Sequence, residues 1–191
     1  LIEALGNVDY IGGRKIKIII AGGASFTQQQ KPHYQDFFKK VSENIKRSRN
    51  ITITGFVDEK AIAPIFEASD LAVFPYRTFM SSSGPLSLAI SHKKPFIISE
   101  NLRGLTNSQD IINAMKISGV EEEIIFKMNK KSLVKAIEKS MQPHVNRKIL
   151  TFSAILNKDR SFESIAKIYN ILLNPPDQKE ISAYSNALSL S

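Results

Sequence analysis

Several features that would define its class are missing from this sequence. None of its 191 residues is cysteine, which excludes disulfide bonds and thiolate metal sites and makes a reducing compartment, the cytoplasm, the expected location. No apolar run approaches the ~20 residues that a membrane span requires. No signal peptide opens the chain. Leu1 to Leu5 instead have the pattern of a helix end, so the sequence is expected to continue upstream.

Acidic residues are scarce relative to basic ones: 18 Asp and Glu stand against 26 Lys and Arg, which gives a net charge of +8. Lysine-rich solvated surfaces account for such a balance, but it also favours anionic partners. The basic residues are dispersed and no RNA-binding aromatic signature occurs, so nucleic acid is not an expected partner. Peripheral association with an anionic membrane, at its inner face, is compatible with the charge.

The sequence also shows no recognisable cluster of metal ligands. Its three histidines, His33, His92 and His144, are scattered and are interpreted as surface or structural residues. We therefore expect no metal and no other cofactor.

Strand and helix patterns alternate along most of the chain. β-Branched or apolar runs predict strands, and apolar stripes at helical spacing predict the helices between them. The predicted strands are 15–21, 50–54, 71–74, 96–99 and, at the sheet edge, 123–126. The expected fold class is α/β: a Rossmann-like open parallel sheet with helices on both faces, followed by C-terminal helices. Residues 1–173 form this domain, and 174–191, which are rich in serine, are predicted to be a flexible tail.

One predicted helix carries two local signals. Asp58 is a favourable N-cap for a helix that carries Ile62, Ile65 and Phe66. Pro64 lies inside this helix, where proline removes a backbone hydrogen bond, so we expect a kink or a late start.

Ligands of an open parallel sheet bind outside the carboxyl ends of its strands. This rule selects the segments 22–25, 55–57, 75–86 and 100–104. Within them, Gly22, Gly23 and Glu100 are predicted to lie in the cleft.

The segment 75–86 carries the most chemical information, because it joins a strand to a helix through a turn rich in hydroxyls. Pro85 suits the first turn of a helix, and a helix start attracts phosphate through its unpaired N–H groups and positive dipole end. Gly84 lets a ligand approach the backbone, and Arg77 offers a fixed positive fork. The candidate phosphate-binding residues are Arg77, Ser82, Ser83, Gly84, Pro85 and Leu86. The alternative is that this turn is only a loop and a helix cap.

Five pieces of the sequence stand in an informative order. They are IIIAGG at 18–23, ITITGFV at 51–57, ASDLAVFPYR at 68–77, SGPLSLAI at 83–90 and KPFIIS at 94–99. In order and spacing they resemble the C-terminal lobe of family-four glycosyltransferases, which have the two-lobed GT-B fold. The resemblance covers nearly all of 1–173.

The resemblance implies that this lobe binds a nucleotide diphosphate sugar, for retaining transfer to a saccharide or lipid-linked acceptor. It implies a nucleobase site at Gly55, Phe56 and Val57 and a diphosphate site at the helix start formed by 83–86. No metal is implied, because the helix dipole and basic side chains neutralise the leaving group. The acceptor-binding N-terminal lobe is then a separate partner, and no catalytic residue is assigned within this chain.

Two departures from the family pattern matter. Many members carry glutamates before and after the phosphate turn, where this chain has Met80 and Leu88. The alternative function is therefore a degenerate, non-catalytic module for nucleotide-sugar binding or assembly. In addition, the family's first strand would precede Leu1 and lie between the strands at 15–21 and 71–74. Without that strand the sheet would have a gap with unpaired backbone groups, so we expect either upstream residues or another segment of the chain to fill this position.

Overall fold

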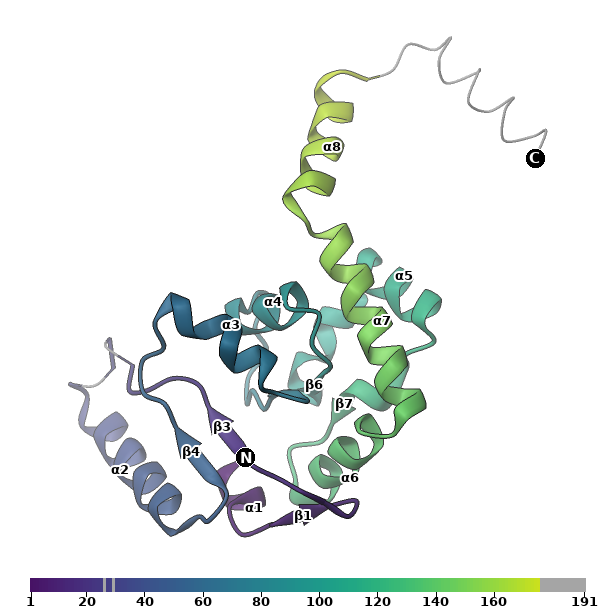
Figure 1. The fold of residues 1–191 in the computed structure, drawn as a ribbon. Helices are drawn as coiled ribbons and strands as arrows, with labels where there is room; N and C mark the ends of the chain where they lie inside the picture. Colours follow the sequence, from purple (N-terminus) through teal and green to yellow (C-terminus); the bar gives the residue numbers. More distant parts are fainter. Residues whose placement is uncertain (26, 29, 176–191) are drawn as a thin grey trace.

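The computed structural model describes residues 1–25, 27–28 and 30–175, and Figure 1 shows their arrangement. The chain is an α/β protein with about 57% helix and small parallel sheets. Its helices are α1 (Ile2–Leu5), α2 (Pro32–Arg47), α3 (Glu59–Glu67), α4 (Gly84–Ser91), α5 (Gln109–Ser118), α6 (Lys130–Ser140), α7 (Pro143–Asp159) and α8 (Phe162–Leu173), with the 3₁₀ segments η1 (Glu100–Asn107) and η2 (Glu122–Ile124). Most of the predicted tail, 176–191, lies outside the described residues.

The amino-terminal segment differs from the single strand predicted at 15–21. Gly12 and Gly13, at φ values of 56° and 77°, form a tight turn between β1 (Tyr10–Ile11) and β2 (Arg14–Lys15), which pair antiparallel. Two consecutive positive φ values are those of a short hairpin turn, which glycine adopts without steric cost. Because Lys15 belongs to this hairpin, the parallel strand β3 (Ile18–Ile20) begins three residues later than predicted.

Helix α3 begins at Glu59, directly after Asp58, whose carboxylate accepts a hydrogen bond from the Lys60 N–H at 3.1 Å. The predicted N-cap is confirmed. Pro64 lies inside the helix, so the late start offered as an alternative is wrong. The absent proline N–H deprives only the Lys60 carbonyl, in the first turn, of its intrahelical partner.

The strands form two parallel groups. In the first, β3 pairs with β4 (Ile51–Ile53). In the second, β6 (Phe96–Ser99) lies between β5 (Ala72–Phe74) and β7 (Ile125–Phe126). The edge position predicted for the last strand is confirmed, because β7 pairs with β6 alone among the described strands.

The single open sheet of the sequence prediction is interrupted. Within the described residues, β3 and β4 pair only with each other, and β5 has no partner except β6, so the parallel strands fall into two separate sheets. The fold class α/β is confirmed, whereas the continuous sheet is replaced by two short ones.

Alternate residues of β6 pack into different layers, as the pleat of a strand requires. Phe96 and Ile98 contact the cluster formed with α4, α5 and α7, while Ile97 contacts the cluster formed with α1, β1 and α6. All four residues of β6 are buried. Helices therefore cover both faces of the second group, as predicted.

Candidate functional site

The turn between β5 and α4 is held in place by three polar side chains. Ser99, fully buried at the end of β6, donates a hydrogen bond from Oγ to the Tyr76 carbonyl at 2.7 Å. The Asn101 amide donates to the carbonyls of Tyr76 and Arg77 at 3.1 and 3.0 Å. The neighbouring strand therefore fixes the path of the chain at Tyr76 and Arg77.

Tyr76 also reaches the start of α4. Its hydroxyl lies 3.0 Å from Ser83 Oγ, and this same oxygen accepts a hydrogen bond from the Leu86 N–H at 3.2 Å. Ser83 is thus the N-cap of α4, and it is buried together with Leu86. Pro85 lies in the first turn, where its missing N–H leaves no donor unpaired.

The cap changes which donors the turn can offer to a ligand. The Leu86 N–H is occupied by Ser83 Oγ and the Ser87 N–H by the Ser83 carbonyl. The amide of Leu86 was predicted to be among the donors directed at a ligand, and this prediction is wrong because the Ser83 hydroxyl occupies it. Gly84 keeps an N–H without an intrahelical acceptor, it is exposed, and a Cβ added to it would meet nothing within 4 Å.

The remaining candidate donors surround Gly84. Arg77 is exposed, with no ion pair among the described residues. Ser82 is exposed, and its hydroxyl has no hydrogen-bond partner among them. Met80 and Leu88, at the positions where the resemblance would lead one to expect glutamates, are 42% and 36% exposed. A ligand at this turn therefore meets apolar side chains where the family presents carboxylates.

The glycine turns at the ends of β3 and β4 form a second group of predicted site residues. Gly22 and Gly55 form an isolated bridge, and a Cβ added to Gly23 would lie 3.2 Å from Gly55 Cα. Gly55, at a φ of 73°, adopts a conformation that favours glycine. Phe56 is 78% exposed and Val57 half-buried. The two backbones approach so closely that only glycine fits at Gly23 without displacing its neighbour.

These two groups are not joined by any hydrogen bond between described residues. The glycine turns belong to the first strand pair and the β5–α4 turn to the second group. Glu100, also predicted in the cleft, accepts a hydrogen bond from the Met128 N–H at 3.2 Å and so connects the ends of β6 and β7.

A cavity of about 350 Å³ opens beside the β5–α4 turn. Three predicted residues, Ser82, Ser83 and Leu86, line it, whereas Arg77 and Gly84 do not. Phe79 covers Gly104 at its mouth, since a Cβ on Gly104 would lie 2.6 Å from the Phe79 ring. The cavity is therefore shared with part of the candidate phosphate site, through Ser82, Ser83 and Leu86, whereas Arg77 and Gly84 lie outside it.

An ion pair borders the cavity. Arg160 Nε donates to Asp110 Oδ2 at 2.7 Å, and the terminal guanidinium nitrogen lies at the same distance. Partial burial raises the pKa of the Asp110 carboxyl, but hydrogen bonds from Arg160 and Ser108 outweigh it, and the pKa is lowered overall. Asp110 therefore stays ionised, and the charge of Arg160 is neutralised within the pair.

Sequence reasoning missed the residues that position the turn. Tyr76, Ser99 and Asn101 have no motif of their own, and their roles depend on the pairing of β5 with β6. The only available signal was a polar residue at the end of the predicted strand 96–99, Ser99, with Asn101 two residues beyond it.

The part of the chain that the structure describes holds no group of three or more His, Asp or Glu side chains suited to a metal ion. His92 stacks on Phe66 at 4.9 Å between ring centroids. No helix among the described residues has the length and apolar character to cross a bilayer. Comparison of the chain with protein family models, with curated proteins and with solved structures found no match.

Proposed function

We propose that the chain is the nucleotide-sugar-binding lobe of a two-lobed glycosyltransferase of the GT-B type. The observation that carries the proposal is the β5–α4 turn, a helix start held at the carboxyl end of a parallel strand by Tyr76, Ser99 and Asn101. It leaves one exposed N–H at Gly84, with Ser82 and Arg77 nearby in sequence. Helix starts of this kind bind phosphate groups.

In the proposed reaction the lobe holds the donor, and a retaining transfer moves its sugar to a saccharide or lipid-linked acceptor. Its contribution is to position the donor and to stabilise the negative charge on the departing nucleotide diphosphate. Arg77 and the Gly84 N–H serve the diphosphate, and the turn formed by Gly55, Phe56 and Val57 serves the base. The acceptor-binding lobe supplies the rest of the site.

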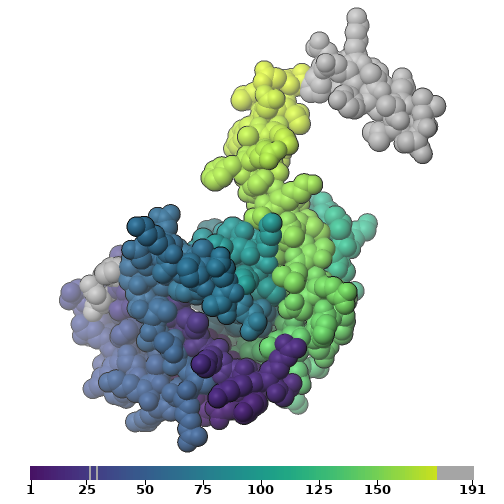
Figure 2. Space-filling model, viewed as in Figure 1, coloured from purple at the N-terminus to yellow at the C-terminus, as the bar shows by residue number. Residues whose placement is uncertain are grey.

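Helix α8 supports the existence of a partner surface for that second lobe. It projects from the body of the molecule, as Figure 2 shows, and none of its residues is buried. Its exposed apolar side chains are Phe162, Ile165, Ile168, Tyr169, Ile171, Leu172 and Leu173. Large apolar side chains exposed in this number on one helix indicate an interaction site, and we assign it to the acceptor lobe rather than to a membrane.

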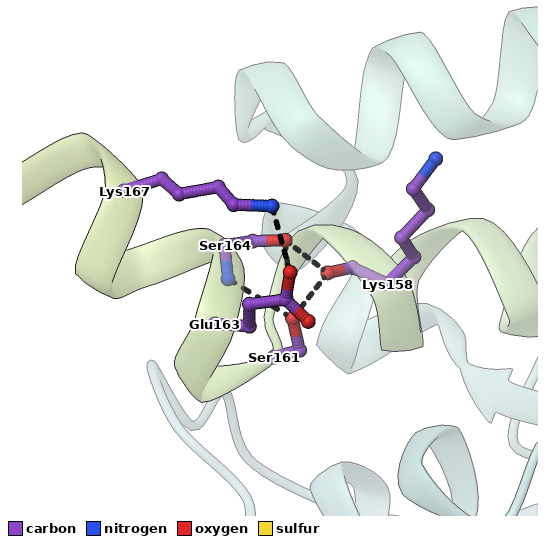
Figure 3. Close-up of polar contacts among 5 residues, drawn as sticks. All are labelled: Lys158, Ser161, Glu163, Ser164 and Lys167. Carbon is purple, nitrogen blue, oxygen red and sulfur yellow. Dashed lines mark hydrogen bonds and ion pairs between the residues drawn. The ribbon is translucent and has the colours of Figure 1, made fainter.

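The direction of α8 is set by a polar joint with α7, drawn in Figure 3. Ser161 Oγ accepts from the Ser164 N–H at 3.1 Å and donates to the Lys158 carbonyl at 2.8 Å. Ser164 Oγ donates to the same carbonyl at 2.7 Å, and Glu163 pairs with Lys167 at 2.7 Å. The cap begins α8 at a defined angle to α7, so the apolar helix is presented outward.

The turn is tested with UDP and GDP as probes in isothermal titration calorimetry. Gly84→Asp introduces bulk and negative charge and is expected to abolish binding, while Gly84→Ala, which has free space for its Cβ, keeps it. Arg77→Gln weakens binding about tenfold, because a charge-assisted hydrogen bond is lost. Arg147→Gln, at an exposed arginine on α7 outside the predicted ligand segments, is the matched control without effect. Absence of binding by the wild type, or unchanged binding by Gly84→Asp, would refute the assignment.

A second candidate function is nucleotide-sugar binding without turnover. The observation that favours it is the pair of exposed apolar side chains, Met80 and Leu88, beside the turn. Release of free sugar or nucleotide from a bound nucleotide sugar, in the presence of acceptors, separates the two candidates. Binding without any release supports the non-catalytic module.

A further inference from the structure

An exposed aromatic ring lies at the mouth of the cavity beside the β5–α4 turn. Phe79 lines this mouth and is 56% exposed. Its ring occupies the space that a side chain at Gly104 would need, since a Cβ there would lie 2.6 Å from Cε2 of the ring and 3.2 Å from Cδ2. Gly104 has no positive φ, so what glycine provides at this position is room for the ring. The ring therefore rests against the backbone of η1 and leaves apolar surface open to a ligand.

Hydroxyl groups line the mouth of the cavity from two segments of the chain. Ser81, Ser82 and Ser87, from the β5–α4 turn and α4, are exposed, and their hydroxyls have no hydrogen-bond partner among the described residues. Thr106 and Ser108 line the same cavity from η1 and from the residue before α5. Their hydroxyls donate to backbone carbonyls at 2.8 and 3.1 Å and keep lone pairs that can accept. The mouth therefore offers both hydrogen-bond donors and acceptors.

The cavity offers a ligand no free charge. Among the described residues that line it, Arg160 alone is charged, and its guanidinium is paired with Asp110 at 2.7 Å. An ionised ligand would lose part of its hydration on entering the cavity without gaining an opposite charge. The lining therefore favours a neutral ligand.

A neutral hexopyranose has the two surfaces that this mouth requires. The C–H groups of its ring form an apolar face, and the hydroxyls around its edge both donate and accept hydrogen bonds. We infer that the mouth of the cavity binds a neutral hexopyranose unit of a saccharide, with the C–H face on Phe79 and the edge hydroxyls at the serines. The inference stands without the proposed function, because Phe79, Ser81 and Ser87 are not among the proposed diphosphate residues.

Saturation-transfer NMR provides the first test. The probes are methyl β-D-glucopyranoside, methyl β-D-galactopyranoside and methyl α-D-mannopyranoside, which differ in the orientation of their hydroxyls. At least one is expected to receive saturation at its ring C–H protons, with the same affinity at about 50 and about 500 mM NaCl, because no charge takes part. Absence of transfer to all three probes, or an affinity that falls with salt, would overturn the inference.

Removal of the aromatic ring provides the second test. Phe79→Ala is expected to lower the affinity for the bound probe about threefold to tenfold, as the loss of one aromatic contact does. Phe37→Ala is the matched control, because Phe37 is 53% exposed and lies on α2, away from the cavity lining. It is expected to keep the wild-type affinity. Unchanged affinity in Phe79→Ala, or an equal loss in Phe37→Ala, contradicts the site.

The contact between Phe79 and Gly104 provides the third test. Gly104→Ala places a Cβ where the ring lies and is expected to weaken saccharide binding, although every hydroxyl at the mouth remains. In a Phe79→Ala background the same change should have no further effect, because there is no ring left to displace. Additive losses would mean that Gly104 does not act through the ring, and would refute its proposed role as the seat of Phe79.

Nucleotide binding separates this inference from the proposed function. Phe79→Ala is expected to bind UDP or GDP as the wild type does. Loss of both ligands in the folded variant would mean that they share one site, which contradicts a separate saccharide site. A wild type that binds a glycoside but neither nucleotide would remove the proposed function and leave this inference in place.

Discussion

The two groups of strands differ sharply in burial, although the sequence gives both the same kind of apolar run. Every residue of β6 is buried, whereas Ile19 at the centre of β3 is 45% exposed. The helices follow the same division. The sixteen residues of α2 include none that is buried, while α7 buries five. The second group of strands packs against a hydrophobic core on each of its faces. The first group is a separate two-stranded sheet.

This difference shows that an apolar pattern predicts an element but not its burial. The stripe on α2 is as regular as that on α6, yet only α6 packs between β1, β6 and β7. Burial depends on how many layers surround a strand, and β3 lacks a second neighbour among the described residues. The proposed phosphate turn follows β5, in the well-packed group, and the proposed base site follows β4, in the loosely packed one.

The largest effect is expected from truncating the buried strand. Ile97→Ala, at a side chain with 0% exposure, should lower the free energy of unfolding by about 3 kcal/mol, because it leaves a cavity between α1 and α6. Ile19→Ala on β3 should change it by less than about 1 kcal/mol. Urea denaturation of both variants measures this contrast. Equal losses would remove the distinction between the two groups.

A smaller effect is expected at the polar link of the first group. The Asn50 amide donates to the carbonyls of Leu5 and Val8 at 3.0 and 2.6 Å and so joins β4 to α1. Asn50→Ala should cost about 2 kcal/mol, because two carbonyls lose their donor in a buried setting. Thr52→Ala, exposed on the same strand, is the control. If Asn50→Ala and Thr52→Ala have the same melting temperature, the hydrogen bonds from Asn50 do not contribute to the stability of this weakly packed part of the molecule.

The smallest effect concerns the ion pair at the cavity of the second group. The pKa of Asp110 is lowered from 3.8 in the folded chain. Its ionised form therefore stabilises the fold above about pH 4, and this contribution is lost as the pH falls through the folded pKa. Asp110→Asn should lower the melting temperature slightly at pH 7 and no longer do so at the lowest pH at which the protein folds. Asp159 has no ion pair among the described residues, so Asp159→Asn should have the same melting temperature as the wild type at both pH values.

Local signals in the sequence predicted much of the fold. Asp58, Pro85 and the apolar run of β6 each specify a local conformation through their own chemistry, and their elements occur where expected. The Gly12–Gly13 turn was not predicted, although paired glycines are a hairpin signal, and Lys15 of the hairpin was assigned to the longer strand 15–21.

The candidate site was less predictable than the fold. The position of the proposed phosphate turn followed from the order of strands and helices, but the occupation of the Leu86 N–H depends on Ser83, whose hydroxyl also lies within hydrogen-bond distance of the Tyr76 hydroxyl. The hollow lined by Ile111 and Phe152 arises from how α5 and α7 pack, and no local pattern records it. Interactions between distant segments decide both features.

The divided sheet also affects how the chain behaves at high concentration. Strand edges with unpaired backbone groups are templates for strands of other molecules, and β3 and β5 each leave one such edge. Their length of three residues limits how many hydrogen bonds an added strand can form. Lys17, directly before β3, adds a charge that opposes such stacking. Short strand edges and a positive charge therefore oppose edge-to-edge association of this chain, whereas a closed sheet would have no free edges.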